Sequence, residues 1–143
     1  MLLELTHEQV AKFWPLISKA IDEALPPIVK RSLDTKEKIL SEFYNDRLIA
    51  LLAVEDEEYS PYALIVAKPM VEDITGTRTF LIYILYAYKK VPITLWEKGY
   101  EDMRKLLKGK YDKILGYTNR EEAISLVKHL NGDASWRLIE LEV

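Results

Sequence analysis

The sequence from Tyr62 to Tyr88, YALIVAKPMVEDITGTRTFLIYILYAY, holds two apolar runs separated by Thr75-Gly76-Thr77. Both runs are rich in Ile, Val, Leu and Tyr, which are typical of strands, and glycine suits the tight turn of a hairpin. A third run of the same kind precedes them and ends in the acidic run Asp56-Glu57-Glu58, which we expect to form a solvated turn. The sequence therefore predicts an antiparallel meander over residues 47–55, 62–74 and 78–88.

Apolar residues at helical spacing on both sides of this meander predict four helices. Each is expected to begin at a capping residue that is followed three positions later by Glu or Gln, and the four pairs are Thr6 with Gln9, Asp34 with Glu37, Thr94 with Glu97, and Asn119 with Glu122. The helices are expected to end at Pro26-Pro27, Asn45-Asp46, Gly109 and Asn131-Gly132. Short strands are predicted at residues 1–5 and 113–117, and a last strand from Trp136 to Val143.

Composition excludes several classes of protein. The chain has 143 residues, no Cys and a net charge of -3. Disulfides and Cys-ligated zinc are therefore excluded, and the negative charge argues against nucleic-acid binding. No apolar run is long enough for a membrane helix, and neither His7 nor His129 has a neighbouring set of metal ligands. We expect a single cytoplasmic domain over residues 1–143, with no metal.

The order of these elements resembles the GNAT superfamily of acyl-CoA N-acyltransferases. The segment from Asn119 to Gly132 is similar to that family's signature on its penultimate helix. The resemblance implies an α/β (α+β) fold, with a mixed, mostly antiparallel twisted sheet and helices on both faces. Three further segments resemble a GNAT-like family of uncharacterised bacteriophage and prophage proteins, and these are residues 5–9, residues 24–27 and residues 75–83.

Active members of the superfamily grip the coenzyme A pyrophosphate with a glycine-rich loop before the crossover helix. The equivalent stretch here, Tyr88 to Thr94, has no glycine, and its Pro92 has no N–H to donate. The position of the usual general-acid tyrosine is occupied by Val127, which cannot transfer a proton. The main prediction is therefore a non-catalytic binding or assembly protein of phage origin that needs no cofactor and is virion-associated if phage-encoded.

The alternative is an acyl-CoA-dependent N-acyltransferase that acts on an unidentified amine. In that case the resemblance places acetyl-CoA against the residues around the start of the crossover helix, namely Tyr88, Lys89, Lys90 and Thr94. The two lysines would replace the lost backbone grip by charge, although a solvated pair is the simpler interpretation. The catalytic residues are unknown at this stage.

Three further interpretations stay open at the level of sequence. The aromatic side chains of Tyr83, Tyr86, Tyr88 and Trp96 line the path of the coenzyme's arm or are simply core. Glu72 and Asp73 supply a general base or are solvated at the sheet edge. The partner is another protein or a second copy of the chain, which would associate through the sheet or through the Trp14 face of the first helix.

Overall fold

The computed structural model describes residues 1–55 and 60–142, so the predicted acidic turn at residues 56–58 lies outside the described residues. In chain order the elements are β1 (Leu2–Glu4), α1 (His7–Lys12), α2 (Trp14–Ala24), α3 (Thr35–Tyr44), β2 (Ile49–Val54), β3 (Pro61–Val71), β4 (Arg78–Ala87), α4 (Ile93–Leu107), β5 (Lys113–Gly116) and α5 (Glu121–His129). The nine segments predicted before residue 133 correspond to these elements, with one predicted helix divided in two.

The five strands form one sheet in the order β1-β2-β3-β4-β5. Neighbouring strands run antiparallel from β1 to β4, and only β4 and β5 are parallel. The hairpin between β3 and β4 closes where the Glu72 N–H donates to the Thr77 carbonyl at 2.9 Å, with Gly76 at a φ of 71°. Both the meander and the mostly antiparallel sheet are confirmed.

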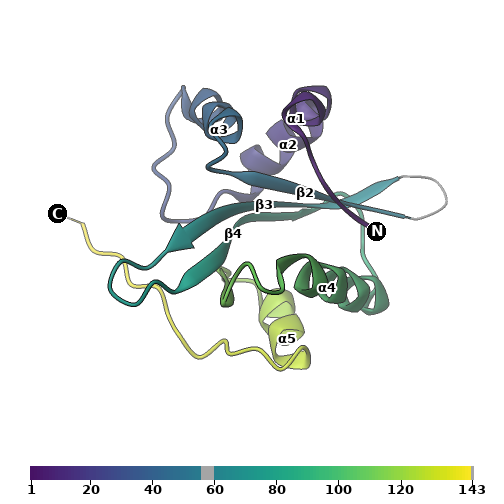
Figure 1. Cartoon of the computed structure of the whole chain (residues 1–143), viewed down its shortest axis with the longest axis vertical. Helices are drawn as coiled ribbons and strands as arrows, with labels where there is room; N and C mark the ends of the chain where they lie inside the picture. Colours follow the sequence, from purple (N-terminus) through teal and green to yellow (C-terminus); the bar gives the residue numbers. More distant parts are fainter. Residues whose placement is uncertain (56–59, 143) are drawn as a thin grey trace.

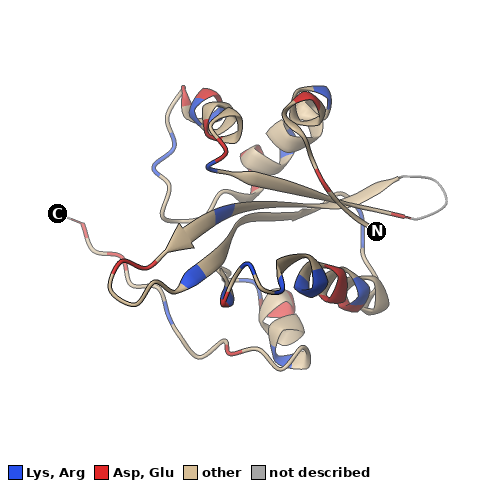
Figure 2. Cartoon of the chain, viewed as in Figure 1, with Lys and Arg blue, Asp and Glu red and all other residues tan. Residues whose placement is uncertain are grey.

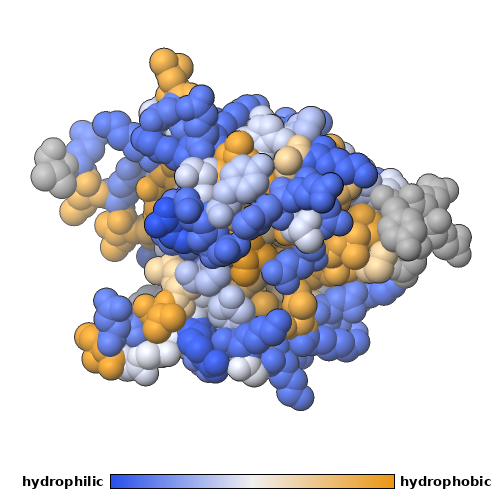
Figure 3. Space-filling view, turned by 45° about the horizontal axis from the view of Figure 1, so that its top comes forward, coloured by the Kyte–Doolittle hydropathy of each residue, from blue (hydrophilic) through white to orange (hydrophobic). Residues whose placement is uncertain are grey.

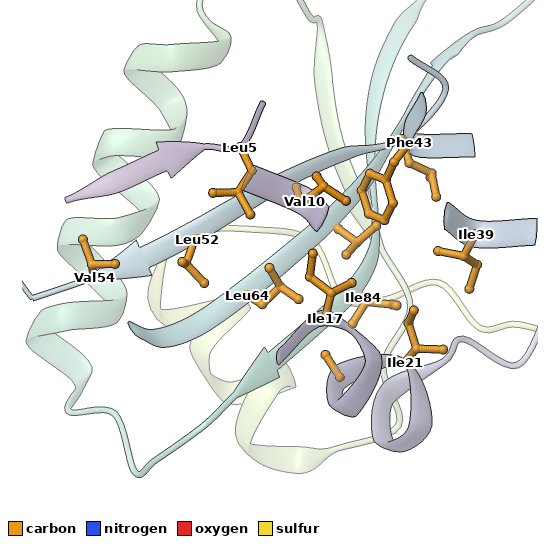
Figure 4. Packing of buried hydrophobic residues seen from close by; sticks show 14 residues of the cluster. Leu5, Val10, Ile17, Ile21, Ile39, Phe43, Leu52, Val54, Leu64 and Ile84 are labelled. Carbon is orange, nitrogen blue, oxygen red and sulfur yellow. The ribbon is translucent and has the colours of Figure 1, made fainter. Parts of the chain in front are cut away.

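Helices cover both faces of the sheet (Figure 1). Helices α1, α2 and α3 pack on one face around Val10, Ile17 and Phe43, which meet the sheet residues Leu64 and Ile84 in the larger core cluster (Figure 4). On the other face α4 packs Met103 and Leu107 against Leu51, Ala67 and Phe80. The two helical layers thus meet the sheet from opposite sides, and β4 contributes side chains to both. In the described residues no helix has the length and apolar character needed to cross a bilayer.

The first predicted helix is divided at Phe13, which ends α1 and precedes α2. Pro15 is the reason, because it has no N–H for the helical hydrogen bond and its ring crowds the preceding turn. A proline is tolerated only in the first turn, and the chain restarts its helix so that Pro15 lies there. The apolar stripe continues across the break, since Val10 and Ile17 are both buried.

One of the four predicted capping boxes forms. The Gln9 N–H donates to Thr6 Oγ1 at 3.2 Å, and the Thr6 N–H donates to Gln9 Oε1 at 2.9 Å. The other three predictions are wrong. The carboxylate of Asp34 accepts the Ser32 hydroxyl and pairs with Lys38 instead of capping α3, while α4 follows Pro92 and α5 follows Arg120, neither with a side-chain cap.

The predicted last strand, residues 136–143, is also wrong for the residues described, because residues 133–142 carry no strand. The helix before them ends as expected: Asn131 has a φ of 59°, and the Gly132 N–H donates to the Val127 carbonyl at 2.8 Å. The Asp133 carboxylate then accepts the Ser135 N–H at 2.9 Å, which turns the chain locally. No neighbouring strand pairs with the segment, so its alternating pattern has nothing to pack against.

Two glycines, one inside α4 and one just after it, are expected to respond to alanine with opposite signs. Gly99 lies inside the helix, and an added Cβ would be 3.7 Å from the Tyr62 hydroxyl, an ordinary contact. Gly99→Ala should therefore raise the free energy of unfolding by about 0.5–1 kcal/mol. Gly109 follows the helix at a φ of 78°, so Gly109→Ala should lower it by roughly 1–2 kcal/mol. Urea denaturation of both variants measures this, and equal signs would contradict the assignment of the helix end.

Candidate functional site

The central strand β4 changes its pairing at Tyr83. Toward β3, Val66 pairs with Ile84 while Ala67 pairs with Ile82, so Tyr83 is the extra residue of a β-bulge. Toward β5, the parallel pairing ends with Ile82 and Gly116. Beyond this point the described residues of β4 have no strand on their β5 side, and their main-chain groups on that edge are open to a ligand. The bulge and the end of pairing coincide at one residue.

The N-terminus of α4 lies just beyond this open edge and suits an anion. Helix α4 has no side-chain cap and no acidic residue in its first turn (Figure 2). The first helical hydrogen bonds are donated by the Leu95 and Trp96 N–H groups to the Pro92 carbonyl. Within the described chain the N–H groups of Ile93 and Thr94 donate to no backbone carbonyl, so they and the helix dipole are available to an anion.

The residues that the sequence analysis placed against acetyl-CoA differ in their surroundings. Lys89 and Lys90 are exposed and directly precede α4. The Lys89 Nζ lies 2.5 Å from Glu55 Oε1, an ion pair that offsets its charge, whereas Lys90 has no ion pair with the described residues. Thr94 is exposed in the first turn of the helix. The fold thus brings Lys89, Lys90 and Thr94 to one helix start, with Lys90 as the freer cation.

Tyr88 and its two neighbouring tyrosines lie on the face of the sheet covered by α2. The Tyr88 hydroxyl donates to the Leu16 carbonyl at 2.9 Å, and the Tyr86 hydroxyl donates to Glu23 Oε2 at 2.6 Å. The Tyr86 and Tyr88 rings meet edge to face at 5.2 Å. Burial, followed by the proximity of Tyr86, raises the pKa of the Tyr88 hydroxyl well above its ordinary value. These two rings therefore act in the core of that layer.

Trp96 lies on the opposite side of the sheet from these tyrosines. It packs with Val91 and Leu95 against Ala53 and Tyr62 in a separate small cluster. This packing anchors the start of α4 to the sheet. The four aromatic side chains that the sequence suggested as the lining of one cleft thus lie in two different layers. Of these four, Tyr83 borders an opening at the surface.

That opening is a hollow of 190 Å³ between α3, the α2–α3 connection and the sheet. Its wall is formed by Val29, Lys30, Ser32, Thr35, Lys38, Ile39, Glu42, Leu48, Lys68 and Tyr83. Burial and the nearby Glu42 carboxylate raise the pKa of the Tyr83 hydroxyl. Glu42 itself accepts from Arg47 Nη2 at 2.9 Å. Sequence reasoning missed this hollow, because its lysines come from separate elements and no local motif connects them.

No protein-family model and no curated protein matches this sequence. Among solved structures, the chain is similar to a probable acetyltransferase with a TM-score of 0.73 at 12% identity, over 100% of this chain and 97% of that one. It is similar to a predicted acetyltransferase with acetyl-CoA from Clostridium acetobutylicum, with a TM-score of 0.67, 15% identity, and 99% and 95% of the two chains covered. A ribosomal-protein-alanine N-acetyltransferase from Brucella melitensis biovar Abortus 2308 gives a TM-score of 0.63, 16% identity, and 100% and 99% coverage.

The chain has the GNAT acetyltransferase fold. The matches to two of these structures cover the whole of this chain. The narrower resemblance to bacteriophage and prophage proteins stays a prediction. Likenesses at this level of identity concern the fold, and the chemistry has to be argued from the site.

The remaining polar candidates have structural roles in this GNAT fold. The Glu72 carboxylate accepts the Ile74 and Thr75 N–H groups at 2.9 and 2.8 Å, so it organises the hairpin turn. The hydrogen bond from the Thr75 hydroxyl, followed by these two backbone bonds, lowers the pKa of Glu72. His7 Nε2 lies 2.8 Å from Asp46 Oδ1. His129 Nε2 lies 2.6 Å from Glu97 Oε1, and this contact joins α5 to α4. In residues 1–55 and 60–142 no three acidic or histidine side chains are grouped to hold a metal ion.

The raised pKa of Tyr88 predicts how stability depends on alkaline pH. A folded-state pKa above the unfolded value of about 10 means that the fold favours the neutral phenol, so this contribution is complete below pH 10 and is lost as pH rises further. Tyr88→Phe should lower the free energy of unfolding by about 0.5–1.5 kcal/mol at pH 8. The deficit relative to the parent should shrink between pH 10 and 11.5 in urea titrations. A deficit that does not change with pH would contradict the role of the buried hydroxyl.

Proposed function

We propose that this protein is an N-acyltransferase that transfers an acyl group from an acyl-CoA to an amine. The observation that carries the proposal is the juxtaposition, within a GNAT fold, of an open β4 edge and an uncapped α4 N-terminus. We favour an acyltransferase over a non-catalytic binding protein, because the start of α4 still suits a phosphate-bearing ligand although the loop before it lacks the glycines of the family.

The residues at the start of α4 fit the phosphates of coenzyme A. The N–H groups of Ile93 and Thr94 point along the helix start, where the dipole favours negative charge. Lys90 adds a cation, and Lys89 joins it if its pair with Glu55 opens. A helix start flanked by two lysines takes the role that glycines have in the family's usual loop. Acetyl-CoA, when bound, would supply the activated thioester carbonyl.

The open edge of β4 suits the arm of such a ligand. Main-chain N–H and C=O groups beyond Ile82 have no strand partner on the β5 side in the described structure. An extended ligand with amide groups can bond to a strand edge in the way that an added strand does. Leu85, which is 40% exposed, supplies apolar contact along this edge. The thioester would then lie near the bulge at Tyr83.

The amine acceptor is best placed in the hollow beside Tyr83. This residue belongs both to the bulge and to the wall of the hollow, so it connects the two sides of the sheet. Glu42 is the carboxylate of that wall, and we assign it as the general base. The amine nitrogen forms its bond to the acyl carbon and gives a proton to Glu42, while the carbon–sulfur bond breaks and coenzyme A leaves as a thiolate that takes a proton from solvent.

Calorimetric titration with acetyl-CoA and with free CoA tests the phosphate site. We expect micromolar binding by the parent chain. Ile93→Pro removes one free N–H at a position where helices accept proline, and Pro92, with φ of -61° and ψ of 151°, is already compatible with a following proline. This variant should bind about tenfold more weakly, since a hydrogen bond to a charged group contributes about 1.5–3 kcal/mol.

A second pair of variants tests whether binding depends on positive charge at the start of α4 or on the loss of any exposed lysine. Lys90→Ala should weaken binding roughly three- to tenfold, because it removes the freer cation beside the phosphates. Lys108→Ala, an exposed lysine at the other end of α4, is the matched control and should leave binding unchanged. Absence of binding at millimolar acetyl-CoA in the parent chain would refute the acyltransferase and leave a binding or assembly protein with a GNAT fold.

Turnover is measured as thiol release from acetyl-CoA over a panel of amines. Glu42→Gln should lower kcat by at least about a hundredfold, as expected for loss of a general base, while acetyl-CoA affinity stays within twofold. Because Lys30 and Lys68 line the hollow, amines that carry a carboxylate should be better acceptors than their amides. Equal activity of Glu42→Gln and the parent would contradict the assignment of the base.

A further inference from the structure

The hollow beside Tyr83 has a wall whose charge is opposite to that of the chain as a whole. Of the described residues that line it, Lys30, Lys38 and Lys68 are basic, and Glu42 is acidic. The chain carries a net charge of -3, so basic residues are concentrated here against the average. A cavity lined mainly by one sign of charge raises the local concentration of ligands of the opposite sign. The hollow therefore attracts an acidic ligand.

Two of these lysines are available to a ligand. Lys38 Nζ lies 3.0 Å from Asp34 Oδ2, and this ion pair offsets its charge. The ammonium groups of Lys30 and Lys68 are exposed and have no ion pair or hydrogen bond with the part of the chain that the structure describes. Lys30 belongs to the connection between α2 and α3, whereas Lys68 belongs to β3. A ligand in the hollow therefore meets two separate cations.

The hydroxyl groups of the wall that come from the α2–α3 connection and the start of α3 are already engaged. Ser32 Oγ donates to Asp34 Oδ1 at 2.5 Å and lies 3.2 Å from Thr35 Oγ1. Thr35 Oγ1 also accepts the Ser32 N–H at 2.8 Å. Recognition of a ligand by the wall therefore depends mainly on the two available lysines and on Glu42.

The size and the apolar part of the hollow limit the ligand to a small molecule. The volume of 190 Å³ lies below the range of about 300–1,000 Å³ that is usual for pockets of drug-sized ligands. Ile39 and Leu48, which are 5% and 7% exposed, give the hollow an apolar floor that suits a few methylene groups. Mostly hydrophilic residues cover the surface of the α1–α3 layer (Figure 3). A molecule of amino-acid size, with charged ends and a short hydrocarbon chain, fits these features.

We propose that the hollow binds, as the acyl acceptor, a small amine that carries two carboxylates, as an acidic amino acid does. Glu42 faces the amino group, and Lys30 and Lys68 each bind one carboxylate, so each charged group of the ligand meets a wall residue of opposite sign. Two lysines on different elements match two separate carboxylates better than one phosphate, whose charges lie together. The inference rests on the proposed function, because it takes the hollow as the acceptor site and names the substrate class of that site.

Calorimetric titration of the full-length chain with L-glutamate, in the absence of acetyl-CoA, tests the ligand class. We expect millimolar or tighter binding, and an affinity about fivefold higher than for L-glutamine, which has the same length and one carboxylate fewer. O-phosphoethanolamine, an amine with a single phosphate, should bind more weakly than L-glutamate. Absence of glutamate binding at tens of millimolar, equal affinity for glutamate and glutamine, or tighter binding of O-phosphoethanolamine would each overturn the proposal.

Lys30→Gln and Lys68→Gln test the partners of the two carboxylates. Each variant should weaken L-glutamate binding about three- to fivefold, because each removes one exposed ion pair. One of the two should also abolish the preference for glutamate over glutamine, since glutamine lacks the carboxylate that this lysine binds. Lys19→Gln, at an exposed position of α2 outside the hollow, is the control and should leave both affinities unchanged. A preference that both lysine variants keep would contradict the assignment.

These measurements separate the acceptor class from the proposed function. If acetyl-CoA binds and L-glutamate does not, the acyltransferase stands and the acceptor class is wrong. If L-glutamate binds with these preferences and acetyl-CoA does not, the ligand class of the hollow stands and the acyltransferase is refuted. If both bind, Lys30→Gln and Lys68→Gln should raise the KM for L-glutamate in the thiol-release assay and leave kcat within about twofold, because the lysines hold the acceptor without taking part in proton transfer.

Discussion

The pairing of β4 is the constraint on which the rest of the structure depends. This strand is held along its length by antiparallel β3 and only over its first residues by parallel β5. The bulge at Tyr83 falls where the pairing between β4 and β5 stops. The bulge changes the direction of the β4 side chains, and beyond it the described part of β4 has no strand on its β5 side. Because β4 also contributes Phe80 to one core layer and Ile84 to the other, this irregularity is supported by packing from both sides.

The proposed chemistry follows from that geometry. The open edge of β4 leads to the start of α4, where uncapped N–H groups and an adjacent lysine favour an anion. On the other face the same bulge residue borders a hollow that holds the carboxylate of Glu42. A donor and an acceptor would thus approach one point of the strand from opposite sides of the sheet. The aromatic residues around it serve mainly to hold the layers in place: Tyr88 is tied to α2, and Trp96 fixes α4.

The fold is shared at 12–16% identity with the acetyltransferases compared above, over nearly their whole lengths. A fold conserved at such low identity rests on the pattern of apolar positions, which many sequences satisfy. The glycine loop and the acid tyrosine of the family are a different kind of feature, because they serve chemistry and can be replaced by other groups. A helix terminus with a lysine offers phosphates a similar environment without glycine, which is why a missing motif alone is a weak argument against activity.

The sequence by itself determined the elements whose signal is local. The two apolar runs around Gly76, the Thr6 and Gln9 capping box and the Asn131-Gly132 helix end all depend on neighbouring residues, and the structure has each of them. Other features needed contacts between distant segments. The bulge at Tyr83 arises from pairing with β3, the hollow joins lysines far apart in the chain, and three predicted caps were lost to competing partners or a shifted helix start. The alternating pattern from Trp136 onward can become a strand only where a neighbouring strand accepts its hydrogen bonds, so only the tertiary structure decided that it stays unpaired in the single chain.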